Sequence, residues 1–456
     1  MFNYIHFKNF KSLDDVRIDF TSKKKAKPLA IIYGENGSGK SNIVSGFYTL
    51  LEFSNTLSVN QIMNSMLEKF KEETECDDDA DRVKELFINH IKKSHRDTDD
   101  IIRASKMIGS TENMSIEYGF EFNGQNGVYY LETDDTKVVK ERLDFVVESK
   151  RGCYFEIDFN KNLKKLNNRV FPNKTYAKEL NKLIEEYWGK HTLISILNHQ
   201  RENKNETYMS ERLSQKFIKI LDLLLDFSCS MKEGISAERS SVSVSRKILT
   251  QLDKGEIPTN FEYELNNAEE FVNSIFTGLY SDIKEAYYKK DVKNNKIIYS
   301  LVFKKIIGGK IIDIDFARES TGTMTILKIL PALYIAINGG IAIVDEFDSG
   351  IHDVLVRDII NEVYKTIEGQ LIITTHNTLL LEEKLLKDSI YFLVIEPNGS
   401  KDVYNINDYD LRTHPNHNMR DLYLKGFYDA IPNTGDFDLD IIKRKFNGDT
   451  IQIYED

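Results

Sequence analysis

The sequence contains little cysteine, proline and tryptophan, and these shortages narrow the classes of protein that it can encode. Its 456 residues include three cysteines, seven prolines and one tryptophan. The cysteines, Cys76, Cys153 and Cys229, are far apart and form no metal-binding pattern, so a reducing cytoplasm is the expected compartment. The low proline content and the lack of low-complexity tracts argue against a disordered chain and favour a globular protein.

Two further features are lacking: a long apolar run and an excess of positive charge. Nothing after Met1 has the length and hydrophobicity of a signal or membrane helix, so no membrane partner is expected. The net charge of −11 argues against a surface that is basic overall, although a local basic groove could still hold a nucleic-acid backbone. The length suits two or three ordinary domains or one large α/β domain with insertions.

Residues 34–41, Gly-Glu-Asn-Gly-Ser-Gly-Lys-Ser, match the phosphate-loop pattern G-x-x-x-x-G-K-[ST]. In such a loop, backbone N–H groups surround the α- and β-phosphates of ATP, Lys40 reaches the β- and γ-phosphates, and the Ser41 hydroxyl is a Mg²⁺ ligand. A short apolar run at 29–33 and helical spacing at 43–51 supply the flanking strand and helix, which disfavours a glycine-rich turn that matches by chance. The predicted nucleotide-binding residues are Asn36, Gly37, Ser38, Gly39, Lys40, Ser41 and Asn42.

A second set of candidate residues lies in the last third of the chain. The apolar run 341–344 ends in Asp345, a candidate Mg²⁺ ligand, and Glu346, which would orient and deprotonate the attacking water. Asp-Glu pairs are also common in surface turns, so the assignment of this pair to an ATPase site depends on the phosphate loop earlier in the chain. The apolar run 371–373 leads to His376, which is placed to sense the γ-phosphate; alone it would more often be a structural histidine.

Ser320 and Gly322 form a Ser-x-Gly turn before a helical run. Such a turn offers N–H groups and a hydroxyl to an anion, and it can equally be an ordinary helix N-cap. The basic stretch 23–27 could contact DNA and the acidic stretch 76–81 could bind metal, but a solvated loop is the favoured interpretation of both.

Alternation of apolar and polar residues predicts β-structure in several places. Residues 2–20 are predicted to form a hairpin, 114–122, 127–132 and 143–148 an antiparallel layer, and 297–314 a second hairpin. Residues 160–300 are predicted to be mainly helical. Their amphipathic stripes, such as 213–224, are too short for a long coiled coil.

In this order, the motifs resemble the heads of ABC-type ATPases, specifically the SMC, RecF and OLD group, which often begin with a segment like Asn-Phe-Lys-Ser at 9–12. Within that group the chain looks most like the RloA-like AAA/ABC ATPases of bacterial defence systems, which include the AriA subunit of PARIS. The stretches that carry this finer resemblance are 321–333, 345–352, 391–396 and 423–432. The resemblance covers roughly residues 1–50 and 300–435.

The resemblance implies an α/β fold, an ABC-type P-loop head in which a mixed sheet and an antiparallel layer carry helical insertions. The expected division is listed here: ATPase lobe I at 1–53 and 107–160, a helical insertion at 54–106, a helical insertion without a long coiled coil at 161–296, lobe II at 297–410, and a C-terminal tail at 411–456.

In such heads, two copies sandwich ATP between the phosphate loop of one and the Ser-x-Gly turn of the other. The resemblance therefore implies a homodimer, with a higher oligomer left open, in which Ser320 and Gly322 act in trans and hydrolysis requires dimerisation. One expected feature is missing, because residues 102–106 contain no glutamine for a Q-loop and Gln200 lies too deep in the helical insertion.

Relatives of the OLD type carry a fused Toprim nuclease, but the Asp-x-Asp run at 436–440 has too few residues around it for that fold and is interpreted as an acidic tail. The expected function is an ATP-hydrolysing sensor or switch in anti-phage defence of the abortive-infection type. It would control a separate effector, a Toprim-type nuclease, with a phage protein as a candidate trigger. The alternatives are a DNA-repair or chromosome-maintenance ATPase that clamps DNA, and a nucleotide-binding scaffold with negligible turnover.

Overall fold

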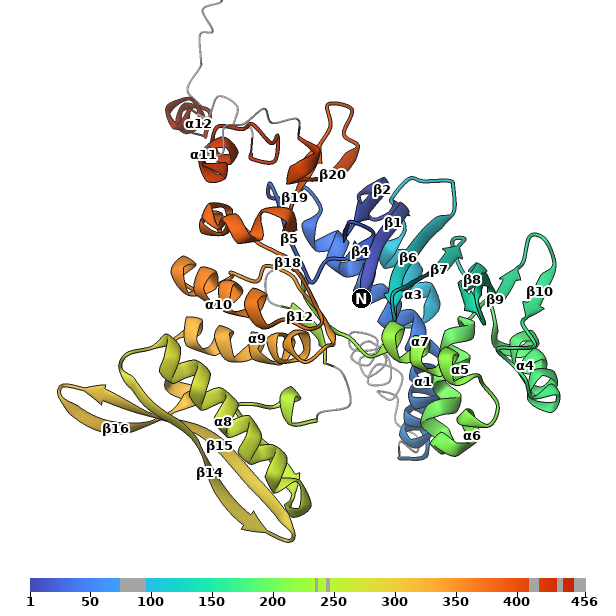
Figure 1. Ribbon diagram of the computed structural model, residues 1–456, viewed down its shortest axis with the longest axis horizontal. Coiled ribbons are helices and arrows are strands. Elements are labelled where there is room, and N and C mark those ends of the chain that lie inside the picture. The colour runs from blue at the N-terminus through green and yellow to red at the C-terminus, as the bar shows by residue number, and fades with distance from the viewer. Residues whose placement is uncertain (74–95, 234–236, 243–246, 410–417, 433–437, 447–456) are drawn as a thin grey trace, which may run out of the picture.

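The computed structural model describes residues 1–73, 96–233, 237–242, 247–409, 418–432 and 438–446 (Figure 1). A mostly parallel sheet lies at the centre of the molecule, with an antiparallel sheet on one side and a smaller projecting sheet on the other. The expected α/β class with a mixed sheet and an antiparallel layer is confirmed. No helix within the described ranges combines the length and apolar character needed to cross a bilayer.

The central sheet has seven strands in the order β12-β11-β17-β18-β5-β19-β20, of which only the two edge strands, β12 and β20, run antiparallel to their neighbours. Its strands are β5 (Leu29–Gly34), β11 (Ser228–Glu233), β12 (Ala237–Ser241), β17 (Ile341–Val344), β18 (Gln370–Thr374), β19 (Ile390–Ile395) and β20 (Lys401–Asn405). β5, β17 and β18 are buried on both faces, as their continuous apolar sequences predict.

Alternate side chains of this sheet enter two separate cores. Ile32, on one face of β5, packs with α1 (Lys40–Glu73) and the antiparallel sheet. Tyr33, on the other face, packs with α9 (Thr321–Ile337) and α10 (Asp353–Thr366). The sheet is therefore fixed from both sides.

The antiparallel sheet has the order β10-β9-β8-β7-β6-β1-β2. Its strands are β1 (Phe2–Phe10), β2 (Leu13–Asp19), β6 (Met114–Phe122), β7 (Gln125–Thr133), β8 (Val138–Val147), β9 (Lys150–Asp158) and β10 (Leu163–Leu166), with a small ribbon of β3 (Thr21–Ser22) and β4 (Lys25–Ala26) nearby. This confirms the predicted hairpin at 2–20 and the predicted antiparallel layer. The sheet packs closely on α1, because a Cβ on Gly46 would lie 2.2 Å from the ring of Phe7.

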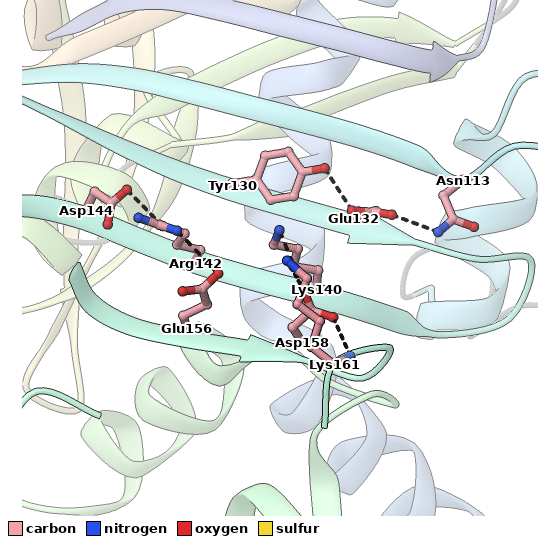
Figure 2. Close-up of polar contacts among 9 residues, drawn as sticks. All are labelled: Asn113, Tyr130, Glu132, Lys140, Arg142, Asp144, Glu156, Asp158 and Lys161. Atoms are coloured by element: carbon pink, nitrogen blue, oxygen red, sulfur yellow. Dashed lines mark hydrogen bonds and ion pairs between the residues drawn. The ribbon is translucent and has the colours of Figure 1, made fainter. Parts of the chain in front are cut away.

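The face of this sheet that points away from the core carries a network of polar side chains (Figure 2). Arg142 on β8 pairs with Asp144 at 2.9 Å and with Glu156 of β9 at 3.3 Å. The rest of the network is Asn113, Tyr130, Glu132, Lys140, Asp158 and Lys161, joined by hydrogen bonds and ion pairs. Cations and carboxylates are therefore paired on this face of the sheet, where the carboxylates are largely buried.

The prediction that residues 160–300 are mainly helical is wrong in part. The helices there are α4 (Lys174–Tyr187), α5 (Leu193–Asn203), α6 (Glu206–Ser210), α7 (Gln215–Leu225) and α8 (Glu262–Leu279). The predicted helical insertion at 161–296 also contains β11, which pairs in parallel with β17 and so belongs to the central sheet. Pairing across a long sequence separation determines this strand, and local periodicity does not reveal it.

The third sheet is built on a long meander of β14 (Ile283–Lys293), β15 (Lys296–Ile307) and β16 (Lys310–Asp315), with β13 (Lys254–Pro258) beside β15. The predicted hairpin at 297–314 corresponds to β15 and β16, whereas β14 lies in the stretch predicted to be helical.

In the predicted insertion at 54–106, α1 continues to Glu73 and α3 spans Thr98–Ser105. The acidic stretch 76–81 and the first two residues of the Asp-x-Asp run lie outside the described residues. The C-terminal region contributes α11 (Met419–Leu424) and α12 (Leu439–Phe446). Tyr428 stacks there on Phe392 of β19, with ring centroids 4.3 Å apart, and anchors this region on the central sheet.

Candidate nucleotide site

The predicted phosphate loop connects β5 to α1, the strand-loop-helix context that the motif requires. Gly37 and Gly39 have φ values of 81° and 113°. Glycine adopts this left-handed region readily, whereas residues with a Cβ atom rarely do. Ser38 is fully buried, and its Oγ has no hydrogen-bond partner within the described structure. An unsatisfied buried hydroxyl inside a glycine loop is an observation that a bound phosphate oxygen would explain.

Lys40 is buried and folds back over the loop. Its Nζ donates to the carbonyl oxygens of Gly34 at 2.8 Å and Glu35 at 3.0 Å. Burial lowers the pKa of Lys40, and the charges of Asp345 and other nearby carboxylates raise it in part. The ammonium is thus held by two backbone carbonyl oxygens of the loop.

Asp345 directly follows β17, and the parallel pairing of β17, β18 and β5 brings the carboxyl ends of these strands to one edge. The Thr374 hydroxyl donates to Asp345 Oδ1 at 2.6 Å, whereas Oδ2 is buried and has no partner in the described part of the chain. A free carboxylate oxygen and the partly buried Ser41 fit Mg²⁺, which usually takes one or two protein ligands, phosphate oxygens and waters. The described residues contain no cluster of three or more His, Cys, Asp or Glu that could hold a metal without phosphate.

Glu346 has a φ of 47°, which is rare for a residue with a side chain. Its backbone N–H donates to Thr374 Oγ1 at 2.8 Å, so one threonine of β18 contacts both Asp345 and Glu346. The Glu346 carboxylate accepts a hydrogen bond from Lys232 Nζ at 2.7 Å, and the same ammonium contacts the Ser349 hydroxyl. The candidate base, Glu346, is therefore paired with Lys232 of β11.

His376 lies two residues beyond β18, and its backbone N–H donates to the carboxylate of Asp348 at 3.2 Å. Burial, and then the positive charge of Lys40, lower the pKa of His376. Nearby carboxylates, among them Glu346, act on it in the opposite direction. The lowered pKa favours the neutral imidazole, and the charge of the loop lysine contributes to this shift.

Ser320 is the N-cap of α9, since its Oγ accepts a hydrogen bond from the Thr323 N–H at 3.2 Å. A Cβ on Gly322 would lie 2.8 Å from the carbonyl oxygen of Gly350, so glycine permits close packing of α9 against the turn after β17. A cavity of about 180 Å³ joins the start of α9 to the candidate carboxylates. It is lined among others by Lys232, Thr321, Asp345, Glu346, Ser349 and Gly350. The role of Ser320 and Gly322 in trans remains a prediction.

Three residues of the site were not among the predicted ones: Thr374, Lys232 and Lys401. Thr374 directly precedes the Thr-His pair, and only the hydrogen bonds reveal its role. Lys232 lies in the stretch predicted to be helical, and Lys401 begins the short edge strand β20, where its Nζ donates to Ser12 Oγ at 2.5 Å. No local sequence pattern marks either lysine, because strand pairing brings both to the site.

One comparison with known proteins identifies a family. Residues 29–382 match the family described as "AAA domain, putative AbiEii toxin, Type IV TA system". No curated protein matches the chain.

Several solved structures are similar at low identity. A crystal structure of an SmcHead bound to the C-winged helix domain of ScpA is 14% identical, with a TM-score of 0.41 and coverage of 88% of this chain and 97% of that one. The SMC head domain from Thermotoga maritima is also 14% identical, with a TM-score of 0.38 and coverage of 89% and 98%. A third structure, an Smc head domain with an extended coiled coil bound to the C-terminal domain of ScpA, derived from Pyrococcus furiosus, is 13% identical, with a TM-score of 0.39 and coverage of 88% and 95%.

The matched segment begins with β5 and ends beyond His376, so it spans the phosphate loop, both candidate carboxylates and the candidate γ-phosphate sensor. The chain belongs to this AAA domain family of ATPases.

Proposed function

We propose that the protein is an ATP-binding and ATP-hydrolysing switch of an anti-phage defence system of the abortive-infection type, and that it controls a separate effector, a Toprim-type nuclease. The observation that carries the ATPase part is the convergence of Lys40, Asp345 and Glu346 at one edge of the central sheet. The defence role is supported by the resemblance to RloA-like ATPases and by the family description, which names a toxin of a toxin-antitoxin system.

In the proposed reaction, Glu346 accepts a proton from water while the water oxygen attacks the γ-phosphorus of ATP. The bond from the γ-phosphorus to the β–γ bridging oxygen breaks, and ADP and phosphate leave. Lys40 and the neutral His376 stabilise the negative charge that develops on the γ-phosphate oxygens. Bound Mg²⁺, held by Ser41 and Asp345, would supply further charge neutralisation.

The contact between Lys232 and Glu346 supports a switch. A carboxylate that accepts a hydrogen bond from an ammonium is a weaker base, because removal of a proton from water then competes with the ion pair. Full activity therefore requires that Lys232 moves or changes partner. In the proposed mechanism, ATP and the α9 turn of a second copy, with Ser320 and Gly322, bring about that change when the dimer closes.

The test is native mass spectrometry of Glu346→Gln protein, expressed with its neighbouring genes and purified in ATP and Mg²⁺. Glu346→Gln should trap the closed state, and the double variant Lys40→Ala/Glu346→Gln is the matched control that cannot use ATP. A multimer with a stoichiometric second protein, lost in the control, is the expected result. A dimer that retains nucleic acid and no second protein would overturn the effector proposal and favour a DNA clamp.

A further inference from the structure

A second buried lysine contacts the phosphate loop. Lys401, at the start of β20, donates from Nζ to the hydroxyl of Ser12, and the same Oγ accepts from Asn42 Nδ2 at 2.7 Å. The Nζ atom lies 3.4 Å from the point that a Cβ on Gly39 would occupy. Three segments that are far apart in the sequence, the turn between β1 and β2, the loop itself and β20, therefore meet at the loop (Figure 1).

The charge of Lys401 is poorly compensated for so buried a group. The residue is 8% exposed, burial lowers its pKa, and Asp14 is the carboxylate that acts against this shift. The structure records no carboxylate paired with Lys401 in the described ranges. A buried ammonium is unfavourable unless an opposite charge or several hydrogen bonds compensate for it.

Lys40, at the other end of the loop, likewise donates to neutral oxygens, the carbonyls of Gly34 and Glu35, although nearby carboxylates such as Asp345 also act on its charge. One short loop thus has two buried ammonium groups whose hydrogen-bond partners are neutral oxygens. An anion that carries two or more charges and fits a glycine loop would satisfy both, and the polyphosphate of a nucleotide has these properties.

Lys27 shows what a buried lysine with a structural role looks like in the same chain. It is also 8% exposed, and burial also lowers its pKa. It lies before β5, at the strand end opposite the loop, where Nζ donates to the Asp388 carbonyl oxygen at 2.6 Å and lies 4.7 Å from the centre of the Tyr391 ring. Three aspartates, Asp388, Asp19 and Asp408, act on its charge. Lys27 therefore has three aspartates and an aromatic ring acting on its charge, whereas Lys401 has Asp14.

We propose that Lys401 is a phosphate-binding residue, held in place by Ser12, and that it contacts the bound nucleotide from the Gly39 end of the loop while Lys40 contacts it from the Gly34 end. This inference deepens the proposed nucleotide site and rests on it. Lys401 contacts the loop and not the sheet edge with Asp345 and Glu346, where hydrolysis is expected. Its contribution to the binding of ATP and of ADP should therefore be about equal.

The test compares Lys401→Met with Lys27→Met by isothermal titration calorimetry with ATP and with ADP. Lys401→Met should bind both nucleotides about tenfold or more weakly, as expected for loss of one charge-assisted contact. Lys27→Met should bind them like the wild type. Lys401→Gln, which can still donate to Ser12 but has no charge, should lose about as much affinity as Lys401→Met. It serves as the second variant if Lys401→Met does not fold.

Unchanged affinity in a folded Lys401 variant would overturn the inference and leave the proposed function intact. Equal losses of nucleotide affinity in the Lys27 and Lys401 variants would also overturn the inference. They would show that replacing any buried lysine weakens binding. A wild-type protein that binds neither nucleotide would contradict the proposed function itself.

Discussion

Two regions of the molecule contain several positively charged side chains, and the two regions differ in the partners of these side chains. On the outer face of the antiparallel sheet, Arg142 and Lys140 lie against carboxylates of the neighbouring strands (Figure 2). At the phosphate loop, Lys40 and Lys401 are buried and donate to backbone carbonyls and a hydroxyl. In the first region the hydrogen-bond partners of the cations are carboxylates, whereas in the second they are neutral oxygens.

We propose that this difference separates residues that stabilise the fold from residues that bind a ligand. A surface pair between charged side chains contributes little free energy, and its removal exposes both groups to water. A buried ammonium without a carboxylate is costly, and it persists where a ligand later supplies the opposite charge. The following predictions test this distinction, from the largest expected effect to the smallest.

Glu346→Gln should lower the ATP hydrolysis rate by about 10²- to 10⁴-fold, the usual contribution of a general base, while ATP still binds. The amide cannot take the proton of the attacking water. Steady-state phosphate release measures the rate, and calorimetry measures the binding. Normal turnover in this variant would mean that another group is the base.

Lys40→Ala should weaken ATP binding by about 100-fold, because it removes the buried ammonium that we propose contacts the phosphates. Lys140→Ala, which removes a paired lysine on the outer sheet, should leave ATP affinity unchanged. Calorimetry on both variants measures the contrast. Equal ATP affinity of Lys40→Ala and the wild type would refute the phosphate-loop assignment.

His191 is a buried titratable residue with a neutral partner that lies outside the phosphate loop. It therefore tests the effect of burial on stability without a ligand. Its Nδ1 lies 3.0 Å from Thr56 Oγ1, and burial lowers its pKa to about 4. The unfolded chain binds the proton near pH 6.5 and the folded chain only near pH 4, so stability is lost as the pH falls through this window.

From this group alone, the free energy of unfolding should fall by about 1 to 2 kcal/mol between pH 7 and pH 5. Urea unfolding of the wild type and of His191→Gln at both pH values measures the difference. The glutamine variant should lose less stability over this range, and identical losses would show that His191 does not carry the effect.

Arg142→Met should produce the smallest change. It breaks the ion pairs with Asp144 and Glu156 on a partly exposed sheet face, so stability should fall by less than about 1 kcal/mol, and less still in high salt. Thermal unfolding at low and high salt measures this. A large loss, or a change in ATP affinity, would show that the paired network does more than cover the sheet.

Local sequence patterns predicted the parts of the fold that such patterns determine. Alternating residues marked β1, β2 and β6, and the continuous apolar runs marked β5 and β17. β11 was missed because its sequence, Ser-Cys-Ser-Met-Lys-Glu, has neither a long apolar run nor bulky alternating residues, and its identity depends on pairing with β17.

The same reason explains which parts of the site were found. Lys40, Asp345 and Glu346 stand in motifs with fixed spacing, so they could be named from the sequence. Lys232 reaches the site because β11 pairs with the distant β17, and Lys401 reaches it because β20 pairs with β19, which in turn pairs with the distant β5. A lysine on a short polar strand has no local signature.

The most direct test of the central claim is sedimentation velocity of Glu346→Gln protein with and without ATP and Mg²⁺. The account predicts monomers without nucleotide and stable dimers or larger assemblies with it, because ATP binds the loop lysines of one copy and joins that loop to the α9 turn of the next. Ser320→Arg in the same background should bind ATP and stay monomeric. The same sedimentation coefficient with and without ATP, in protein shown to bind it, would contradict the account.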